Sequence, residues 1–202
     1  RRRTSQDDFV TALASTNVDG RLLTDDEVLL NCDGMLSGGL ETTPLAVAGA
    51  LVAFAENPQC WQQLRAQPEL VDTAVEEILR WTSPPAHVMR TALTDTTLGE
   101  ADIRSGDRVV VWLPSANRDE AVFTDGDRFA IDRTPNPHLA FGGGPHYCVG
   151  AVLARLELRC MLTVLARHVS AVDLSGREMR RQSNFLHGHH IAEVTVSATT
   201  GR

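Results

Sequence analysis

The residue best placed to do chemistry in this chain is Cys148, within the stretch FGGGPHYCVG from Phe141 to Gly150. An apolar helical pattern follows directly, so the thiol should lie beside the unpaired N–H groups and the positive dipole end of a helix start. Both favour thiolate over thiol. Cys148 is therefore a candidate metal ligand or nucleophile. The alternative is a glycine-rich turn around a buried, inert cysteine.

The residues around this cysteine indicate which ligand it would meet. Glycine permits backbone angles that are closed to other residues and lets a flat partner approach the main chain closely. Phe141 can cover the sulfur from one side. The loop therefore suits a large, planar, metal-bearing ligand, and its glycines are Gly142, Gly143, Gly144 and Gly150.

A second candidate lies in GGLETTP, from Gly38 to Pro44, inside an apolar pattern that predicts one long helix. Two adjacent glycines cost a helix about 1 kcal/mol each relative to alanine, and Pro44 lacks the amide of a regular turn. Such a weakened centre lets a flat ligand lie against the backbone. The Thr42 hydroxyl can bond a carbonyl one turn earlier or face a ligand, and Glu41 beside it is a possible proton source. The alternative is a small-residue packing site with a capping threonine.

Two further features carry charge. Glu77 and Arg80 stand at i, i+3 in a predicted helix, where most such pairs are solvated surface bridges worth less than about 1 kcal/mol. Arg90 follows Pro84-Pro85 in a strand-like stretch. Its guanidinium suits a carboxylate, which it can hold in a planar fork.

Periodicity predicts a mainly α fold with small β-sheets. Thr24 and Glu27 read as a capping box. We expect a broadly buried final helix, and we expect Cys32, Cys60 and Cys160 to be buried and reduced. The predicted helices are 5–16, 24–56, 58–66, 68–81 and 149–168, and the predicted strands are 88–92, 109–112, 169–172 and 192–196.

Composition narrows the class of protein. The chain has 202 residues, 43% hydrophobic content and a formal charge of −7. Its only basic run is Arg1–Arg3, so we expect no nucleic-acid partner. We find neither a signal peptide nor an apolar run of membrane-spanning length, which predicts a cytoplasmic chain without a membrane partner. The cysteines lack C-x-x-C spacing, which argues against a zinc ribbon or c-type haem.

The spacing Phe141-x-x-Gly144-x-His146-x-Cys148-x-Gly150 resembles the haem-ligand loop of the cytochrome P-450 monooxygenases, with histidine where many members carry arginine. Three more elements match in order. The segment Gly38 to Pro44 resembles the oxygen-binding kink of the family's distal helix. Glu77-x-x-Arg80 resembles its E-x-x-R element, and Arg128 falls where a second arginine closes that network. The resemblance covers nearly the whole chain and corresponds to the C-terminal, haem-binding half of a member.

The resemblance implies haem b, iron protoporphyrin IX, with the Cys148 thiolate as axial iron ligand. It implies that Thr42 and Glu41 deliver protons during the reaction with O2, and that Glu77, Arg80 and Arg128 form a structural network. Other positions are expected to touch haem, namely His146, Arg90, Phe141, Gly142, Gly150, Gly38 and Gly39. The expected substrate contacts are Met35, Val88, Met89 and Leu186.

The implied activity is insertion of one oxygen atom from O2 into a small organic substrate, which fits bacterial secondary metabolism. Electrons would come from NAD(P)H through ferredoxin reductase and ferredoxin. Arg155 and Arg159 are candidates for docking the ferredoxin, or else they merely solvate the helix. Because the sequence opens in a helical pattern without Met, we expect an N-terminal half to be supplied by a missing segment or a second chain. The rivals are a catalytically silent scaffold and a metal-free thiol enzyme with His146 as base.

Overall fold

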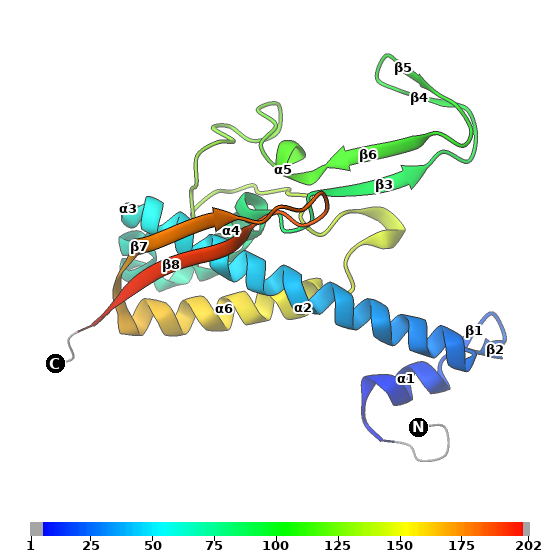
Figure 1. Cartoon of the computed structure of the whole chain (residues 1–202), viewed down its shortest axis with the longest axis horizontal. Coiled ribbons are helices and arrows are strands. Elements are labelled where there is room, and N and C mark those ends of the chain that lie inside the picture. Colours follow the sequence, from blue (N-terminus) through cyan, green and yellow to red (C-terminus); the bar gives the residue numbers. More distant parts are fainter. Residues whose placement is uncertain (1–5, 200–202) are drawn as a thin grey trace. The chain divides into compact units, whose positions relative to one another are not determined.

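The computed structural model describes residues 6–199, and the predicted basic run Arg1–Arg3 lies outside them. The chain divides into two compact units, Arg1–Glu41 and Thr42–Arg202. This boundary falls inside the segment Gly38 to Pro44, where the sequence predicts a weak helix centre. Figure 1 labels the helices and strands.

The first unit begins with helix α1, Phe9–Ser15. The Asp8 carboxylate caps it by accepting a hydrogen bond of 2.7 Å from the Thr11 amide. This is the usual way to satisfy an N–H group that has no partner inside the helix. A short antiparallel hairpin follows, formed by β1 (Asn17–Val18) and β2 (Arg21–Leu22).

The predicted capping box at Thr24 is confirmed. The Thr24 amide donates to the Glu27 carboxylate at 2.8 Å, and the Glu27 amide donates to the Thr24 hydroxyl at 3.2 Å. The Arg21 guanidinium also donates two hydrogen bonds of 2.7 Å to the Glu27 carboxylate. The hydrogen bonds from Arg21 and from the Thr24 amide lower the pKa of Glu27 to about 2. The reciprocal bonds define the start of helix α2.

Helix α2, Asp25–Glu56, confirms the predicted helix over 24–56 and contains Pro44 without a break. By length and composition alone it could cross a membrane. A core helix of a globular protein meets the same criterion. In the second unit, the C-terminal part of α2 is such a core element, since Ala50 and Phe54 are fully buried.

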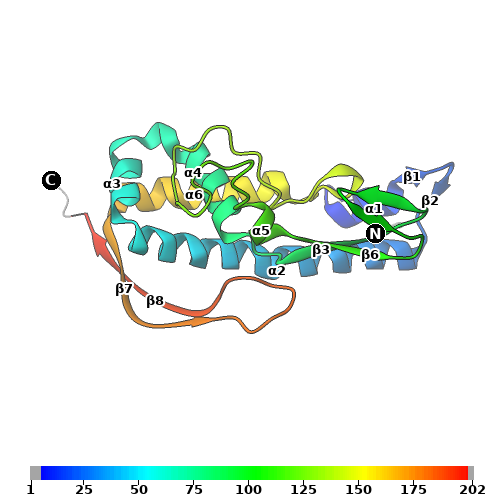
Figure 2. The ribbon, with the colours of Figure 1, turned by 90° about the horizontal axis from the view of Figure 1, so that it is seen from above.

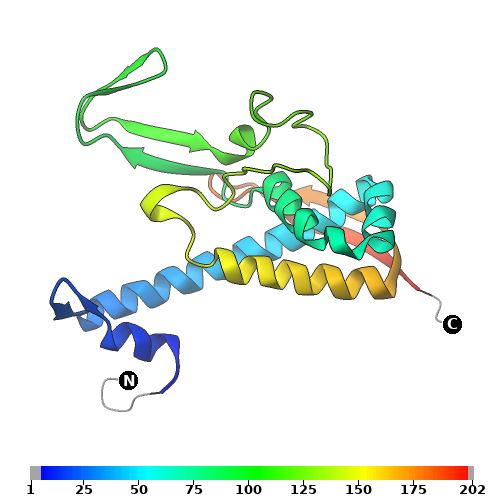
Figure 3. The same cartoon turned by 180° about the vertical axis from the view of Figure 1, so that it is seen from behind.

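The core of the second unit lies between α2 and three further helices. Its large, fully buried members include Phe54, Trp61, Ile78 and Leu158, each at most 1% exposed. The Phe54 and Trp61 rings meet edge to face at 5.0 Å, a favoured aromatic geometry. Figure 3 shows α6 beside α3 and α4. The helical bounds are α3 Pro58–Ala66, η1 Pro68–Leu70, α4 Val71–Thr82, α5 Leu113–Ala116, η2 Gly144–His146 and α6 Ala151–His168.

The sheets within residues 42–199 are antiparallel pairs. They are β3 (His87–Thr91) with β6 (Arg108–Trp112), β4 (Thr96–Leu98) with β5 (Ala101–Ile103), and β7 (Val169–Arg180) with β8 (His189–Ala198). Figure 2 shows β7 and β8 as a long ribbon beside the helices. These two strands are longer than predicted because register shifts interrupt the alternation by which a sequence reveals a strand.

Two expectations about burial are wrong. Helix α6 was expected to be buried over a broad face, yet Val152 is 79% exposed and Leu156 52% exposed, and only Ala151, Leu158 and Leu162 are buried. Cys160 is exposed and Cys32 half-buried, whereas Cys60 is buried as expected. Within residues 42–199, one side of α6 contacts the helices α3 and α4. The exposed side chains of Val152, Leu156 and Cys160 lie on the other side of α6.

Candidate functional site

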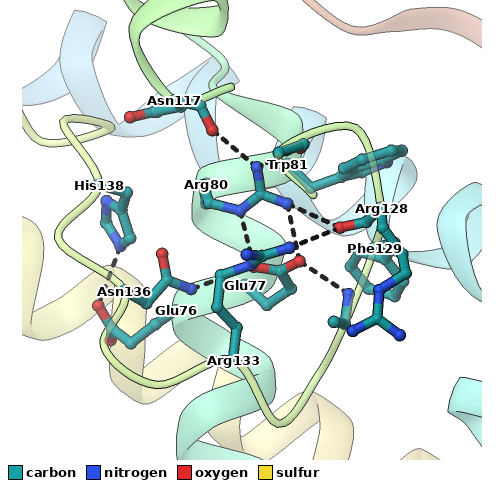
Figure 4. A network of polar contacts seen from close by, with 12 residues as sticks. Glu76, Glu77, Arg80, Trp81, Asn117, Arg128, Phe129, Arg133, Asn136 and His138 are labelled. Atoms are coloured by element: carbon teal, nitrogen blue, oxygen red, sulfur yellow. Dashed lines mark hydrogen bonds and ion pairs between the residues drawn. The ribbon is translucent and has the colours of Figure 1, made fainter. Parts of the chain in front are cut away.

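Helix α4 holds a completely buried ion pair between Glu77 and Arg80 (Figure 4). The Arg80 Nε and Nη2 atoms each donate to one Glu77 carboxylate oxygen at 2.8 Å. The i, i+3 spacing in a helix places both side chains on one face. The predicted pair is therefore present, and it is a core element rather than a solvated bridge.

Every hydrogen-bonding group of Arg80 has a partner. Nη1 donates to the carbonyl oxygens of Asn117 and Gly126, both at 2.7 Å, and Nη2 also reaches the carbonyl of Arg128 at 3.1 Å. Glu77 accepts a further bond of 2.8 Å from the Ala130 amide. A buried ion pair is tolerated only when its remaining donors and acceptors are satisfied in this way. The pair thus fixes the irregular segment 117–130 onto α4.

The second arginine of this network is Arg133, not Arg128 as the sequence led us to expect. Arg133 Nε lies 3.1 Å from Glu77 Oε2, and its side chain is 9% exposed. Its Nη atoms donate to the carbonyls of Thr124, Asp125 and Arg128. Arg128 contributes only this carbonyl to the network. The chain turns between Arg128 and Arg133, and this turn directs the Arg133 side chain toward Glu77.

Asn117 is a buried residue of this region that sequence reasoning did not single out. Its Oδ1 accepts from the Leu139 amide at 2.7 Å, and its Nδ2 donates to the Ser83 hydroxyl at 2.8 Å. It therefore joins the end of α4 to the segment that leads into the cysteine loop. No local pattern marks it, because its partners are distant in sequence.

The residue before Glu77 carries a second carboxylate, which turns toward α6. Arg155 donates hydrogen bonds of 2.7 and 2.9 Å to the two Glu76 carboxylate oxygens, and His138 Nε2 lies 3.0 Å from Glu76 Oε2. His138 Nδ1 accepts from the Ala140 amide at 3.2 Å, so the neutral Nε2–H tautomer satisfies both contacts. The adjacent carboxylates of α4 thus hold two different segments of the chain.

The pKa of Glu76 results from opposing effects. Burial alone would raise it, but hydrogen bonds from Arg155 and His138 outweigh burial and lower the pKa to about 2. A carboxyl group with a lowered pKa stabilises the folded state above its unfolded pKa, and that contribution is lost as pH falls through the folded value. Glu76 should therefore stabilise the fold fully at neutral pH and lose this effect between about pH 4.5 and pH 2.

Comparing Glu76→Gln with the parent protein tests this pH dependence. At pH 7 the variant should be less stable by roughly 1–2 kcal/mol, the usual range for hydrogen bonds to a half-exposed charged group. The deficit should shrink as pH falls toward 2, because the parent carboxyl then becomes neutral as well. Denaturant unfolding at several pH values measures it. A deficit that stays constant across this range would contradict the pKa assignment.

The cysteine loop has the predicted backbone character. Gly142 and Gly144 have φ values of +69° and +66°, which L-residues with side chains rarely adopt. The Cys148 amide donates to the Phe141 carbonyl at 3.0 Å and closes the loop. Cys148 is exposed and lies just before α6, which has Gly150 as its N-cap. The exposed thiol argues against the inert, buried cysteine of the alternative interpretation.

The surroundings of Cys148 fit a flat apolar group. A Cβ added at Gly143 or Gly144 would meet no atom within 4 Å, so the loop presents bare backbone. Val149 and Val152, which follow the thiol, are about four-fifths exposed, at 80% and 79%. Apolar side chains this exposed at the start of a helix mark a surface that another group covers. The donor set of one thiol beside an apolar surface fits haem bound through a thiolate.

The strand β3 carries three of the predicted contacts. Because side chains alternate along a strand, Val88 and Arg90 share one face and Met89 lies on the other. The predicted substrate contacts Val88 and Met89 are therefore separated by the sheet. Arg90 is exposed, and its Nη1 donates to the Met89 carbonyl at 2.9 Å; among residues 6–199 its other guanidinium donors make no further hydrogen bond.

The loop before β8 reaches β3 and the second part of α2. Leu186 forms a bridge with Pro85. Gly188 packs so closely on Leu45 that a Cβ there would lie 2.9 Å from its side chain. Since Leu45 follows Thr42 by one turn, the second unit brings the loop that carries the predicted contact Leu186 close to the part of α2 that begins at Thr42. Met35, Gly38, Gly39 and Glu41 belong to the first unit, and their roles remain predictions.

The comparisons with known proteins agree in one family. The chain is 40% identical to linalool 8-monooxygenase of Pseudomonas putida over 188 residues, which are 93% of this chain and 46% of that protein. It is 41% identical to cytochrome P450 NovI of Streptomyces niveus over 197 residues, covering 98% and 48% of the two chains. The chain thus spans about half the length of the curated relatives it matches.

Solved structures give the same result. P450 OxyD, involved in the biosynthesis of vancomycin-type antibiotics, superposes with a TM-score of 0.90 at 45% identity, covering 98% of this chain and 50% of that one. CYP108D1 of Novosphingobium aromaticivorans gives 0.91 at 38% identity, covering 98% and 48%. These similarities confirm the predicted mainly α fold with small sheets. The model of the family named cytochrome P450 matches residues 1–187, and the chain belongs to the cytochrome P450 family.

Proposed function

We propose that this chain is the haem-binding part of a haem-thiolate monooxygenase that inserts one oxygen atom from O2 into a small organic substrate. The observation that carries the proposal is the exposed Cys148 thiol in a glycine loop beside a bare apolar surface. The family membership and the monooxygenase relatives support it. A role in bacterial secondary metabolism is part of the proposal, which the antibiotic-related neighbour supports.

The proposed cofactor is haem b, which when bound supplies the chemistry that activates O2. Cys148 would hold the iron as thiolate, a ligand that donates electron density to the metal. Phe141 covers one side of the loop, and Gly142 and Gly150 leave room for the porphyrin. Arg90 and His146 would donate hydrogen bonds to the haem carboxylates.

The chain's own residues would control protons and water. Thr42 would hold a proton on its hydroxyl and Glu41 on its carboxyl, both in the weakened segment of α2. In the second unit, Val88 and Leu186 are the proposed substrate contacts; Met35, Gly38 and Gly39 of the first unit are proposed contacts on the resemblance alone. The scaffold alternative gives no chemical reason for a chain to keep both Cys148 and Thr42, so we favour the enzyme.

Thr42→Ala should leave haem binding nearly intact while diverting reducing equivalents into hydrogen peroxide. Proton delivery by a positioned side chain contributes about 10²–10⁴-fold to a rate, so product formation should fall by at least about tenfold relative to NAD(P)H use. Thr43→Ala is the matched control, since it removes the same hydroxyl one residue along the helix. The measurement is the ratio of product to NAD(P)H consumed. An unchanged ratio in Thr42→Ala would remove Thr42 from the mechanism.

The remaining parts of the proposal concern partners. We propose that ferredoxin and its reductase supply electrons, that a further segment or second chain completes the haem pocket over the exposed face of α6, and that the protein is cytoplasmic. Arg155 and Arg159 are not free positive charges, because they pair with Glu76 and Asp72, both at 2.7 Å. We therefore assign no ferredoxin docking role to them.

The experiment that tests the function uses the intact protein with a ferredoxin and its reductase. Haem content should approach one per chain, and NAD(P)H-dependent oxygen uptake should rise with a bound substrate. Cys148→Ser should lose at least about tenfold in haem affinity, the size of change that ligand-shell substitutions produce at metal sites. A protein that binds no haem and takes up no oxygen would support the scaffold alternative.

A further inference from the structure

The Arg155 side chain on α6 contacts the cysteine loop at two places. Its Nη1 donates to the Tyr147 hydroxyl at 3.1 Å, and its guanidinium carbon lies 4.6 Å from the centre of the Phe141 ring. Tyr147 directly precedes Cys148, and Phe141 accepts the Cys148 amide. Arg155 therefore touches both ends of the loop that carries the thiol.

Arg155 is itself held in one orientation. Nε and Nη2 donate to the two oxygens of Glu76 at 2.7 and 2.9 Å, a fork that fixes the guanidinium plane. Burial would lower the pKa of Arg155, but the hydrogen bond to Glu76 outweighs it and raises this pKa. His138 holds the other side of Glu76, and its ring lies 6.0 Å from Phe141. The carboxylate is thus clamped between the segment before the loop and the helix after it.

We propose that Glu76 and Arg155 are positioning residues that set the geometry of the Cys148 ligand. This inference rests on the proposed haem-thiolate function, and the arrangement extends it to residues outside the ligand loop. The fork orients Arg155, Arg155 clamps Tyr147 and Phe141, and those two fix the Cys148 backbone. Outer partners of this kind orient a metal ligand and tune the metal that it binds.

Helix α6 offers a matched control in Arg159, one turn further along. It also bridges α6 to α4 through a 2.7 Å pair, with Asp72. Its recorded contacts include no residue of the loop from Phe141 to Cys148. Arg155→Ala and Arg159→Ala therefore each remove one bridge between the same two helices, and only the first should release the loop. Arg155→Lys keeps the charge but lacks the planar fork.

The first measurement is amide hydrogen exchange of the haem-free intact protein, which does not depend on the cofactor. Exchange at Cys148 should accelerate on the order of tenfold in Arg155→Ala, because the loop loses the contacts that hold it closed. It should stay near the parent rate in Arg159→Ala, and Arg155→Lys should resemble Arg155→Ala. Unchanged exchange in the core of α4 shows that each variant is folded. Equal rates at Cys148 in the two alanine variants would overturn the inference.

The second measurement uses the haem-loaded protein. Haem should leave Arg155→Ala about 10-fold faster than Arg159→Ala, and its reduced carbon monoxide complex should lose part of the red-shifted thiolate band. Full restoration by Arg155→Lys would show that charge rather than the fork acts, which would also overturn the inference. If the parent protein itself lacks the thiolate band, the proposed function fails, and the exchange experiment still decides whether Arg155 holds the loop.

Discussion

Glu77→Ala should destabilise the folded state by about 3–5 kcal/mol, the usual cost of removing one partner of a buried ion pair. The variant leaves the Arg80 guanidinium uncompensated in a site where both side chains are 0% exposed. It also removes the acceptor of the Ala130 amide and the Arg133 Nε, which donate to the same carboxylate. Denaturant unfolding of the intact protein measures the loss. Asp72→Ala on the same helix is the control, because its pair with Arg159 is exposed and worth less than about 1 kcal/mol.

Denaturant unfolding also distinguishes between Arg133 and Arg128 as the second arginine of the network. Arg133→Ala removes a contact to Glu77 and three bonds to carbonyl groups, so it should cost at least about 2 kcal/mol. Arg128→Ala keeps the backbone carbonyl that Arg80 and Arg133 use, so its cost should stay below about 1 kcal/mol. A larger loss of stability in Arg128→Ala than in Arg133→Ala would contradict the assignment of Arg133 as the second arginine of the network.

The parts of this network that were predictable from sequence are those set by local geometry. Glu77 and Arg80 lie in one helix, where the spacing fixes their relation. The irregular segment 117–138 has no periodicity, so the inward turn of Arg133 and the burial of Asn117 depend on how this segment packs on α4. The contact between Glu76 and Arg155 joins residues 79 apart in the sequence. Nothing local to either residue indicates it.

The same distinction applies to the cysteine loop and to helix α6. Glycine at positions 142 and 144 indicates a left-handed backbone, and the structure has it there. The apolar pattern from Val152 to Leu165 predicts a helix, and the structure has that as well. Which of these side chains are covered depends on the neighbours of the helix, so Leu158 is buried and Val152 is not. Periodicity shows which face of a helix is apolar enough to be buried. It does not show which other parts of the protein cover that face.

Cys148→Ala is the second substitution with a large expected effect. The thiolate is the only direct bond that we propose between this chain and the iron, so the variant should lose haem affinity by about 10–100-fold. Any haem that remains bound should lack the spectroscopic signature of a thiolate. Cys160→Ala is the matched control, because this second exposed cysteine lies in the middle of α6, away from the loop glycines. It should bind haem as the parent protein does.

The most direct test of the account is the absorption spectrum of the reduced, carbon-monoxide-bound protein, recorded for the parent, Cys148→Ala and Cys160→Ala. Thiolate ligation shifts the Soret band strongly to the red, so the account predicts this band in the parent and in Cys160→Ala and its loss in Cys148→Ala. A red-shifted band that persists in Cys148→Ala, or its absence from the haem-loaded parent, would contradict the assignment of Cys148 as the haem ligand.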